Sequence, residues 1–184
     1  MKLNLSTKEI TLVGMCAALM AIFSQLSIPL PFTAVPITLQ IFGLVIISVI
    51  VGAKIGTISI IVFDLLGAIG LPVFANFHGG FGVIVGPTGG YIIGFIIMAF
   101  LIGYASSKQN KILLFIATYI GSTADLLIGT LQLKIVTGMS MQAALIAGLY
   151  PFIIKDFIII SLAVLIGSKV KNSIQPILSK NVSA

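Results

Sequence analysis

The sequence predicts an all-α integral membrane protein, with six transmembrane helices and two outer loops that fold inward. Three observations support this fold class. Hydrophobic residues make up 59% of the 184 residues and charged residues only 8%, whereas soluble domains carry about 25% charged residues. The apolar residues fall in runs of membrane-spanning length. The lysines gather at the predicted helix ends of one side, as expected for a membrane protein with a fixed orientation.

The apolar runs divide into six segments within a single domain that covers residues 1–184. A bilayer core about 30 Å thick requires roughly 20 apolar helical residues, and fewer where protein shields the helix ends. No linker or shift in composition divides the chain. The predicted segments are residues 8–29, 37–52, 55–70, 90–106, 112–133 and 142–168.

Local signals place two of these boundaries. Ser6 and Glu9 have the spacing of a capping box, which begins the first helix. The apolar run of residues 37–70 is too long for one span at 1.5 Å per residue. We therefore expect a break within residues 52–56. The first segment has no small-residue cleavage site, so we expect it to be retained as a span.

The lysines predict the orientation. With six spans, both termini share one side with the loops near residues 54 and 106–111. That side holds eight lysines, the opposite side holds Lys134, and Lys155 lies within the last segment. Under the positive-inside rule, both termini are therefore cytoplasmic. The eight are Lys2, Lys8, Lys54, Lys108, Lys111, Lys169, Lys171 and Lys180.

Two apolar interruptions then face the outside. They are residues 27–36 (SIPLPFTAVP) and residues 71–89, and both are rich in proline or glycine. Irregular backbone at membrane depth persists only where it is buried in protein or lines a cavity. We therefore expect these loops to fold inward as the lid or wall of a pocket. The alternative is a simple interfacial loop.

Four ionisable residues lie inside predicted segments: Asp64, Asp125, Lys155 and Asp156. Such a group at the bilayer centre costs upwards of about 2.5 kcal/mol, so each needs a partner or a function. For Asp64 and Asp125, structural pairing and a functional role stay equally open. Asp156 is the better site candidate because it follows Pro151, which we expect to kink the last helix. Lys155 and Asp156 diverge by about 100° on a helix, so we expect no salt bridge between them.

The chain lacks the motifs of enzymes and of nucleic-acid-binding proteins. It contains neither a G-x-x-x-x-G-K-[ST] phosphate loop nor a G-x-S-x-G nucleophile elbow. His78 has no neighbour at zinc-ligand spacing, and Cys16 alone excludes an internal disulfide. The net charge of +6 comes from scattered lysines with no basic stripe for nucleic acid. We therefore expect a protein of the lipid bilayer with no catalytic residue, no metal and no cofactor.

Three stretches carry a resemblance to a known family. They are GLPVFANFHGGFGVIVGPTGGY at residues 70–91, PITLQ at residues 36–40, and Pro151, Phe152 and Asp156 in the last segment. With its six spans, the chain resembles the BioY family, the substrate-binding S components of energy-coupling factor (ECF) biotin transporters. The resemblance implies a high-affinity biotin-binding subunit in the plasma membrane of a prokaryote. It also implies partners on other chains: a transmembrane coupling protein (EcfT-like) and two ABC-type ATPases.

The last segment departs from the pattern of this family, which is P-F-x-P-x-D followed by lysine three residues later. Ile154 stands at the second proline, and Ile159 stands at the lysine. Lys155 instead precedes the aspartate. The resemblance therefore transfers a binding role to Asp156 and not directly to Lys155.

The implied ligand suggests how the site is built. Biotin carries a ureido head with two N–H donors and one carbonyl acceptor, an apolar ring system and a carboxylate tail. Asp156 and Asn76 suit the ureido head, and Gly89 and Gly90 would let backbone approach the ligand closely. The candidate donors for the carboxylate are Lys155, Gln40 and backbone N–H groups near Thr88. The expected apolar walls are Phe32, Phe77, Phe81, Tyr91 and Phe152.

Small residues on the first helix suggest a docking surface. Gly14, Ala17 and Ala21 lie on nearly one stripe, which lets another helix approach closely. By resemblance, this stripe docks onto the coupling protein. Packing within the six-helix unit is the alternative.

Two other functions stay open. One is a free-standing, proton-coupled secondary transporter of a small polar metabolite, with Asp64, Asp125 or Asp156 as proton relay. The other is an assembly subunit without a ligand. Inverted repeats would favour the transporter, but residues 1–90 and 91–184 show no convincing similarity.

Overall fold

Long helices form most of the computed structural model, which describes residues 5–180 and their side chains as far as residue 174. The long helices are α1 (Thr7–Gln25), α2 (Gln40–Ala68), α4 (Gly89–Ser107), α5 (Lys111–Thr137) and α7 (Tyr150–Lys180). The short elements are β1 (Ser27–Ile28), β2 (Ile37–Thr38), the 3-10 helix η1 (Ala75–Phe77), α3 (Phe81–Ile84) and α6 (Met141–Gly148). Within the described residues, five helical stretches are long and apolar enough to cross a membrane. The predicted all-α membrane fold class is confirmed.

Helix α2 contains two of the predicted segments and folds back on itself at Gly52. This residue has φ 79° and ψ −180°, a conformation that is essentially restricted to glycine. A Cβ atom on Gly56 would lie 3.3 Å from the Ser48 Cα, whereas eight residues of straight helix span about 12 Å. The two halves therefore run side by side in opposite directions, and the break expected within residues 52–56 lies at Gly52.

Capping groups begin the first helix as predicted. The Ser6 backbone N–H donates to Glu9 Oε2 at 2.8 Å, and the Glu9 N–H donates to Ser6 Oγ at 3.3 Å. Glu9 also forms an ion pair of 2.7 Å with Lys54, just after the α2 turn. The start of α1 and the turn of α2 therefore lie at the same end of the molecule.

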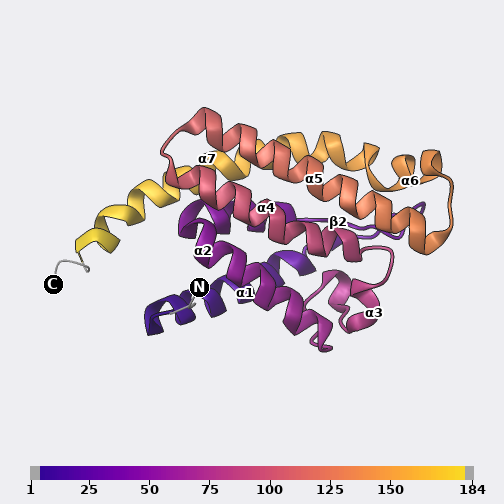
Figure 1. Cartoon of the computed structure of the whole chain (residues 1–184), viewed down its shortest axis with the longest axis horizontal. Helices are drawn as coiled ribbons and strands as arrows, with labels where there is room; N and C mark the ends of the chain where they lie inside the picture. The colour runs from indigo at the N-terminus through magenta and orange to yellow at the C-terminus, as the bar shows by residue number, and fades with distance from the viewer. Residues whose placement is uncertain (1–4, 181–184) are drawn as a thin grey trace.

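The helices pack in layers around α4, which lies between α2 and α5 (Figure 1). Helix α1 covers α2, and α7 packs against both α2 and α5. Lys171 of α7 donates to the Ser106 carbonyl at 2.9 Å, so the late part of α7 lies beside the end of α4. The lysine-rich positions therefore gather at one end of the structure. Lys2 lies outside the described residues.

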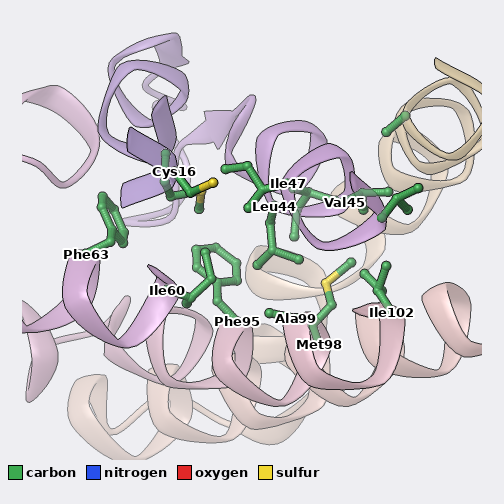
Figure 2. Close-up of a cluster of buried hydrophobic side chains, with 14 of the residues drawn as sticks. Cys16, Leu44, Val45, Ile47, Ile60, Phe63, Phe95, Met98, Ala99 and Ile102 are labelled. Atoms are coloured by element: carbon green, nitrogen blue, oxygen red, sulfur yellow. The ribbon is translucent and has the colours of Figure 1, made fainter. Parts of the chain in front are cut away.

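The core between α1, α2 and α4 is made of apolar side chains (Figure 2). Leu44, Ile60, Met98 and Ile102 are fully buried there. In a bilayer, helices associate through close van der Waals contact rather than through exclusion of water, and glycine permits that contact. Gly103 of α4, for example, lies directly on the Ala53 backbone at the α2 turn.

The last predicted segment, residues 142–168, differs from the structure. It comprises α6 and α7, which are separated at Leu149, where φ is −125° and ψ is −57°. Pro151 is the second residue of α7, so it begins a helix instead of kinking one. Its missing N–H costs nothing in a first helical turn.

The predicted stripe of Gly14, Ala17 and Ala21 is not a lipid-facing surface. Ala17 is buried in the core against α2, and Ala21 is partly buried beside it. Gly14 is exposed, as is Ala18. Two of the three small residues therefore provide packing within the helix bundle, which was the alternative interpretation.

Candidate ligand-binding cavity

Both loops that interrupt the helices line one cavity of about 410 Å³. This volume is within the usual range for small-molecule sites, about 300–1,000 Å³. The prediction that the loops wall a pocket is confirmed. The cavity is lined by Ala34, Val35, Pro36, Thr38, Gln40 and Ile41 from the first loop and the start of α2; by Phe74, Ala75, Asn76, His78, Gly82, Val83, Gly86, Pro87 and Thr88 from the second loop; and by Tyr91, Ile92, Phe95, Asp125, Leu126, Phe152, Lys155 and Asp156 from α4, α5 and α7.

One glutamine side chain at the end of α1 holds the second loop in place. Gln25 Nε2 donates to the carbonyl groups of Pro72, Val73 and Phe74 at 3.2 to 3.3 Å. Gln25 Oε1 accepts a hydrogen bond from the Phe77 N–H at 2.9 Å. The Phe74 ring is buried on Gly67 and makes an edge contact with Phe63 at 5.5 Å. The hydrogen bonds of Gln25 give partners to the loop backbone, and the Phe74 contacts anchor the loop on α2.

Asn76 lies at the turn that Gln25 supports. Asn76 and Phe77 have φ values of 57° and 58°, which are uncommon for residues other than glycine and occur most readily at asparagine. Ser27 Oγ donates to Asn76 Oδ1 at 2.9 Å, and this bond links the two loops. The carboxamide of Asn76 thus lies at the cavity wall in a defined orientation.

Lys155 and Asp156 both line the cavity and form an ion pair. Lys155 Nζ lies 2.9 Å from Asp156 Oδ1, and Ser122 Oγ donates to Asp156 Oδ2 at 3.4 Å. The prediction that no salt bridge joins these neighbours is wrong. The four-carbon lysine stem folds over Phe152, with Nζ 5.3 Å from the ring centroid, and this reach overcomes the divergence of the two side chains on the helix.

Gln40 and Tyr91 line the cavity with their polar atoms already bonded. Gln40 accepts from Thr38 Oγ1 and donates to Ser24 Oγ, both at 3.0 Å. The Tyr91 hydroxyl donates to the Gly148 carbonyl at 2.8 Å. Both residues therefore contribute surface to the cavity wall, but these polar atoms are already hydrogen-bonded within the protein.

Five predicted site residues do not line the cavity. Gly89 lies against the Ile84 backbone at the end of α3, and Gly90 lies against α5 at Ile128 and Gln132, so a side chain at either would collide and both permit close packing. Gln132 in turn holds the second loop by donating to the carbonyls of Ile84 and Gly86, both at 2.8 Å. The phenyl rings that were expected as walls point outward and are 60 to 71% exposed: Phe32, Phe77 and Phe81.

Other side chains take the place of those rings. Val35, Phe74, Phe95 and Leu126 form apolar wall beside Tyr91 and Phe152. Sequence patterns do not distinguish these residues from ordinary core positions. Asp125 also lines the cavity. The sequence indicated this residue as a candidate because it is an ionisable side chain within a predicted span. Among the described residues, no group of three or more His, Cys, Asp and Glu side chains could hold a metal ion.

Apolar helices around a cavity with a few polar groups define a membrane-embedded protein that binds a small molecule. The chain belongs to the BioY family, whose model matches residues 1–176. It is 36% identical to the "Probable biotin transporter BioY" of Pyrococcus horikoshii over 92% of this chain and 99% of that protein. It is also 36% identical to the "Biotin transporter BioY" of Thermotoga maritima over 89% of this chain and 96% of that protein.

A solved structure has the same fold. The crystal structure of the S-component for biotin from an ECF-type ABC transporter superposes with a TM-score of 0.82 and 32% sequence identity. The alignment covers 94% of this chain and 95% of that chain. The family resemblance predicted from the motifs is therefore confirmed.

Proposed function

We propose that this protein is the biotin-binding S component of an ECF-type importer. The observation that carries the proposal is the cavity, whose lining joins Asn76 and the Lys155–Asp156 pair with apolar and aromatic side chains. The similarity to a biotin S-component over nearly the whole chain supports the same ligand. As a transporter component, the protein binds biotin as cargo and is not an enzyme.

The ureido head of biotin suits the polar side of the cavity. Asp156 accepts an N–H hydrogen bond, and the Asn76 carboxamide both donates and accepts. The apolar rings contact Phe74, Tyr91 and Phe152, which line the cavity. A few placed polar groups in such a pocket set the orientation of a ligand.

The carboxylate tail needs a donor, and Lys155 suits it best. It is the only lysine among the described residues that line the cavity. Gln40 is already bonded to Thr38 and Ser24. Backbone N–H groups at the start of α4, near Thr88, are the second candidate because a helix N-terminus favours an anion.

Uptake requires other chains. This sequence has no phosphate loop, so the ATPase activity of an ABC transporter comes from partners. We assign ATP hydrolysis to two ABC-type ATPases and the link between them and this chain to an EcfT-like coupling protein. We do not place the coupling protein on the stripe of Ala17 and Ala21, because Ala17 is buried in the core and Ala21 is partly buried beside it.

We also propose that both termini are cytoplasmic in the plasma membrane of a prokaryote, on the basis of the lysine distribution. Ser107 and Gln142 are exposed residues beyond opposite ends of α5. In a Cys16→Ala background, Ser107→Cys should react with an impermeant maleimide only in opened cells, and Gln142→Cys should react in intact cells. The opposite pattern would refute this orientation.

The function is tested by the ligand itself. Protein purified in detergent should release biotin, identified by mass spectrometry, and the stripped protein should bind biotin in titration calorimetry. Proteoliposomes with this chain alone should show no biotin accumulation driven by a proton gradient. Accumulation there, or the absence of biotin binding, would favour the free-standing secondary transporter instead.

A further inference from the structure

A second, smaller cavity lies at the lysine-rich end of the molecule and shares no lining residue with the ligand-binding cavity. It forms where the end of α4, the start of α5 and the late part of α7 meet beside α2. Buried apolar side chains of Val49, Ala105 and Leu114 make one part of its wall. Its volume of about 280 Å³ is just below the range of about 300–1,000 Å³ for small-molecule sites. The cavity therefore has room for a small head group.

Lys171 of α7 brings a positive charge to this cavity. Its Nζ donates to the Ser106 carbonyl at 2.9 Å and to Ser106 Oγ at 2.8 Å, and Ser106 Oγ donates to the Val49 carbonyl at 2.6 Å. These bonds fix the ammonium group at the end of α4. An ammonium group has three donors, so one is left for a ligand. Among the described residues, no carboxylate pairs with Lys171.

Further donors surround Lys171. Lys111 lines the cavity at the first position of α5, where a helix has backbone N–H groups without intrahelical partners and favours an anion. The Ser168 hydroxyl and the Asn172 carboxamide line the cavity from α7, and neither makes a hydrogen bond to another described residue. The lining contains two lysines and no carboxylate. Such a wall suits an oxyanion, of which a phosphate group is the commonest in a cell membrane.

The surroundings of the cavity favour a lipid over a soluble anion. Leu165 lies one turn before Ser168 on the same face of α7, and it is 52% exposed. It belongs to a stretch that is apolar enough to cross a membrane, so the cavity opens beside surface that suits acyl chains. We place the lysine-rich end in the cytoplasm, where the leaflet carries anionic lipids and basic pockets between helices bind their head groups.

We propose that this cavity binds the phosphate group of an anionic phospholipid. Lys171 and Lys111 contact the phosphate oxygens, and Ser168 and Asn172 contact the other polar atoms of the head group. The lipid site does not depend on biotin. Only its assignment to the cytoplasmic leaflet rests on the proposed orientation.

The test is lipid binding to delipidated protein in detergent, measured by native mass spectrometry. Wild-type protein should bind one phosphatidylglycerol at least about tenfold more tightly than phosphatidylcholine, whose head group carries its own cation. The double variant Lys111→Gln with Lys171→Gln should bind phosphatidylglycerol at least about tenfold more weakly, because each lysine contributes to the attraction.

The matched control is Lys108→Gln with Lys169→Gln. It removes the same charge from the same end of the molecule, but neither lysine lines the cavity, and Lys108 Nζ lies over the Tyr104 ring, 4.9 Å from its centroid. This control should change the affinity for phosphatidylglycerol by less than about threefold. An equal loss in the two double variants would show attraction to the whole lysine-rich end and would overturn the site.

A second pair of variants leaves the Lys171–Ser106 bonds intact, in case the double lysine variant does not fold. Asn172→Asp places a carboxylate in the cavity lining and should weaken phosphatidylglycerol binding at least about tenfold through charge repulsion. Ser173→Asp places the same charge at an exposed neighbour that does not line the cavity, and it should bind as wild type does. Equal affinities in these two variants would contradict the proposal.

Two further measurements separate the lipid from other occupants. Millimolar inorganic phosphate or glycerol 3-phosphate should not displace phosphatidylglycerol from wild-type protein; displacement would assign the cavity to a soluble phosphate and overturn the lipid site. If the lysine variants lose copurifying partner subunits but keep wild-type lipid affinity, the cavity is a protein-docking surface and the proposal fails. None of these results depends on biotin, so the proposed function is tested separately.

Discussion

Lys155 Nζ lies 2.9 Å from Asp156 Oδ1, although the two residues are neighbours on one helix. The side chains are only 17% and 5% exposed, so water screens the pair little. A lysine beside a carboxylate in an apolar cavity stabilises a charge that would be costly alone. The pair therefore keeps Asp156 available to a ligand while limiting the cost of burying it.

Removing the cation should destabilise the protein more than removing the pair. Lys155→Met leaves Asp156 buried without its partner, and such a change costs on the order of 3–5 kcal/mol. The double variant Lys155→Met with Asp156→Asn should recover part of this loss. Thermal denaturation in detergent measures both, with Lys134→Met as the control outside the cavity. An unchanged thermal midpoint for Lys155→Met would show that the ion pair contributes nothing to the stability of the protein.

The polar groups of the cavity should determine biotin affinity. Asn76→Ala and Asp156→Ala should each weaken biotin binding at least about tenfold, because a buried ligand N–H or carbonyl loses its partner. Titration calorimetry on stripped protein measures the effect, and size exclusion checks folding. Asn172→Ala, an exposed asparagine late in α7, is the control. Near-native affinity in both site variants would contradict this pocket.

Gln25 should control how long a ligand stays bound. Gln25→Ala removes four hydrogen bonds to the second loop. We expect the dissociation rate of biotin to rise at least about tenfold, since each lost bond is worth roughly 1 kcal/mol. Radiolabelled biotin release measures this rate. The exposed Gln142 provides the control Gln142→Ala, and equal rates in the two variants would show that the loop holds without Gln25.

Two adjacent alanines on α1 should respond differently to a large side chain. Ala17 is 3% exposed, so Ala17→Trp overpacks the core against α2 and should lower the thermal midpoint, with a cost of about 1–3 kcal/mol or more. Ala18 is exposed, and Ala18→Trp should be tolerated. Size exclusion and thermal denaturation compare them. A stable Ala17→Trp protein would contradict the buried position of this residue.

Gly52 should be required for the reversal of α2. Alanine at φ 79° and ψ −180° is strained, by about 1–3 kcal/mol. The strain arises from the backbone alone, because a Cβ atom there would meet nothing within 4 Å. Gly14→Ala, at an exposed helical position with equal space, should be neutral or stabilising. Similar denaturation midpoints for the two variants would contradict the turn.

The sequence by itself determined the membrane class, the helical segments, the break in the run of residues 37–70 and the two loops that wall the cavity. These features follow from local physics: the hydrophobicity of a run, the length of a bilayer crossing and the backbone freedom of glycine. It also pointed to Asn76, Lys155 and Asp156, because a polar or charged side chain in an apolar segment is costly and therefore informative.

Only the tertiary structure decided which neighbours those groups meet. Phe77 and Phe81 point outward while Phe74 of the same loop points inward, although aromatic residues in one loop look alike in a sequence. In the structure, Ala17 packs in the core, Gly89 and Gly90 permit close packing, and Lys155 forms an ion pair with Asp156. Each outcome depends on the direction of a side chain relative to residues far away in the chain, and this direction is set by how the helices pack.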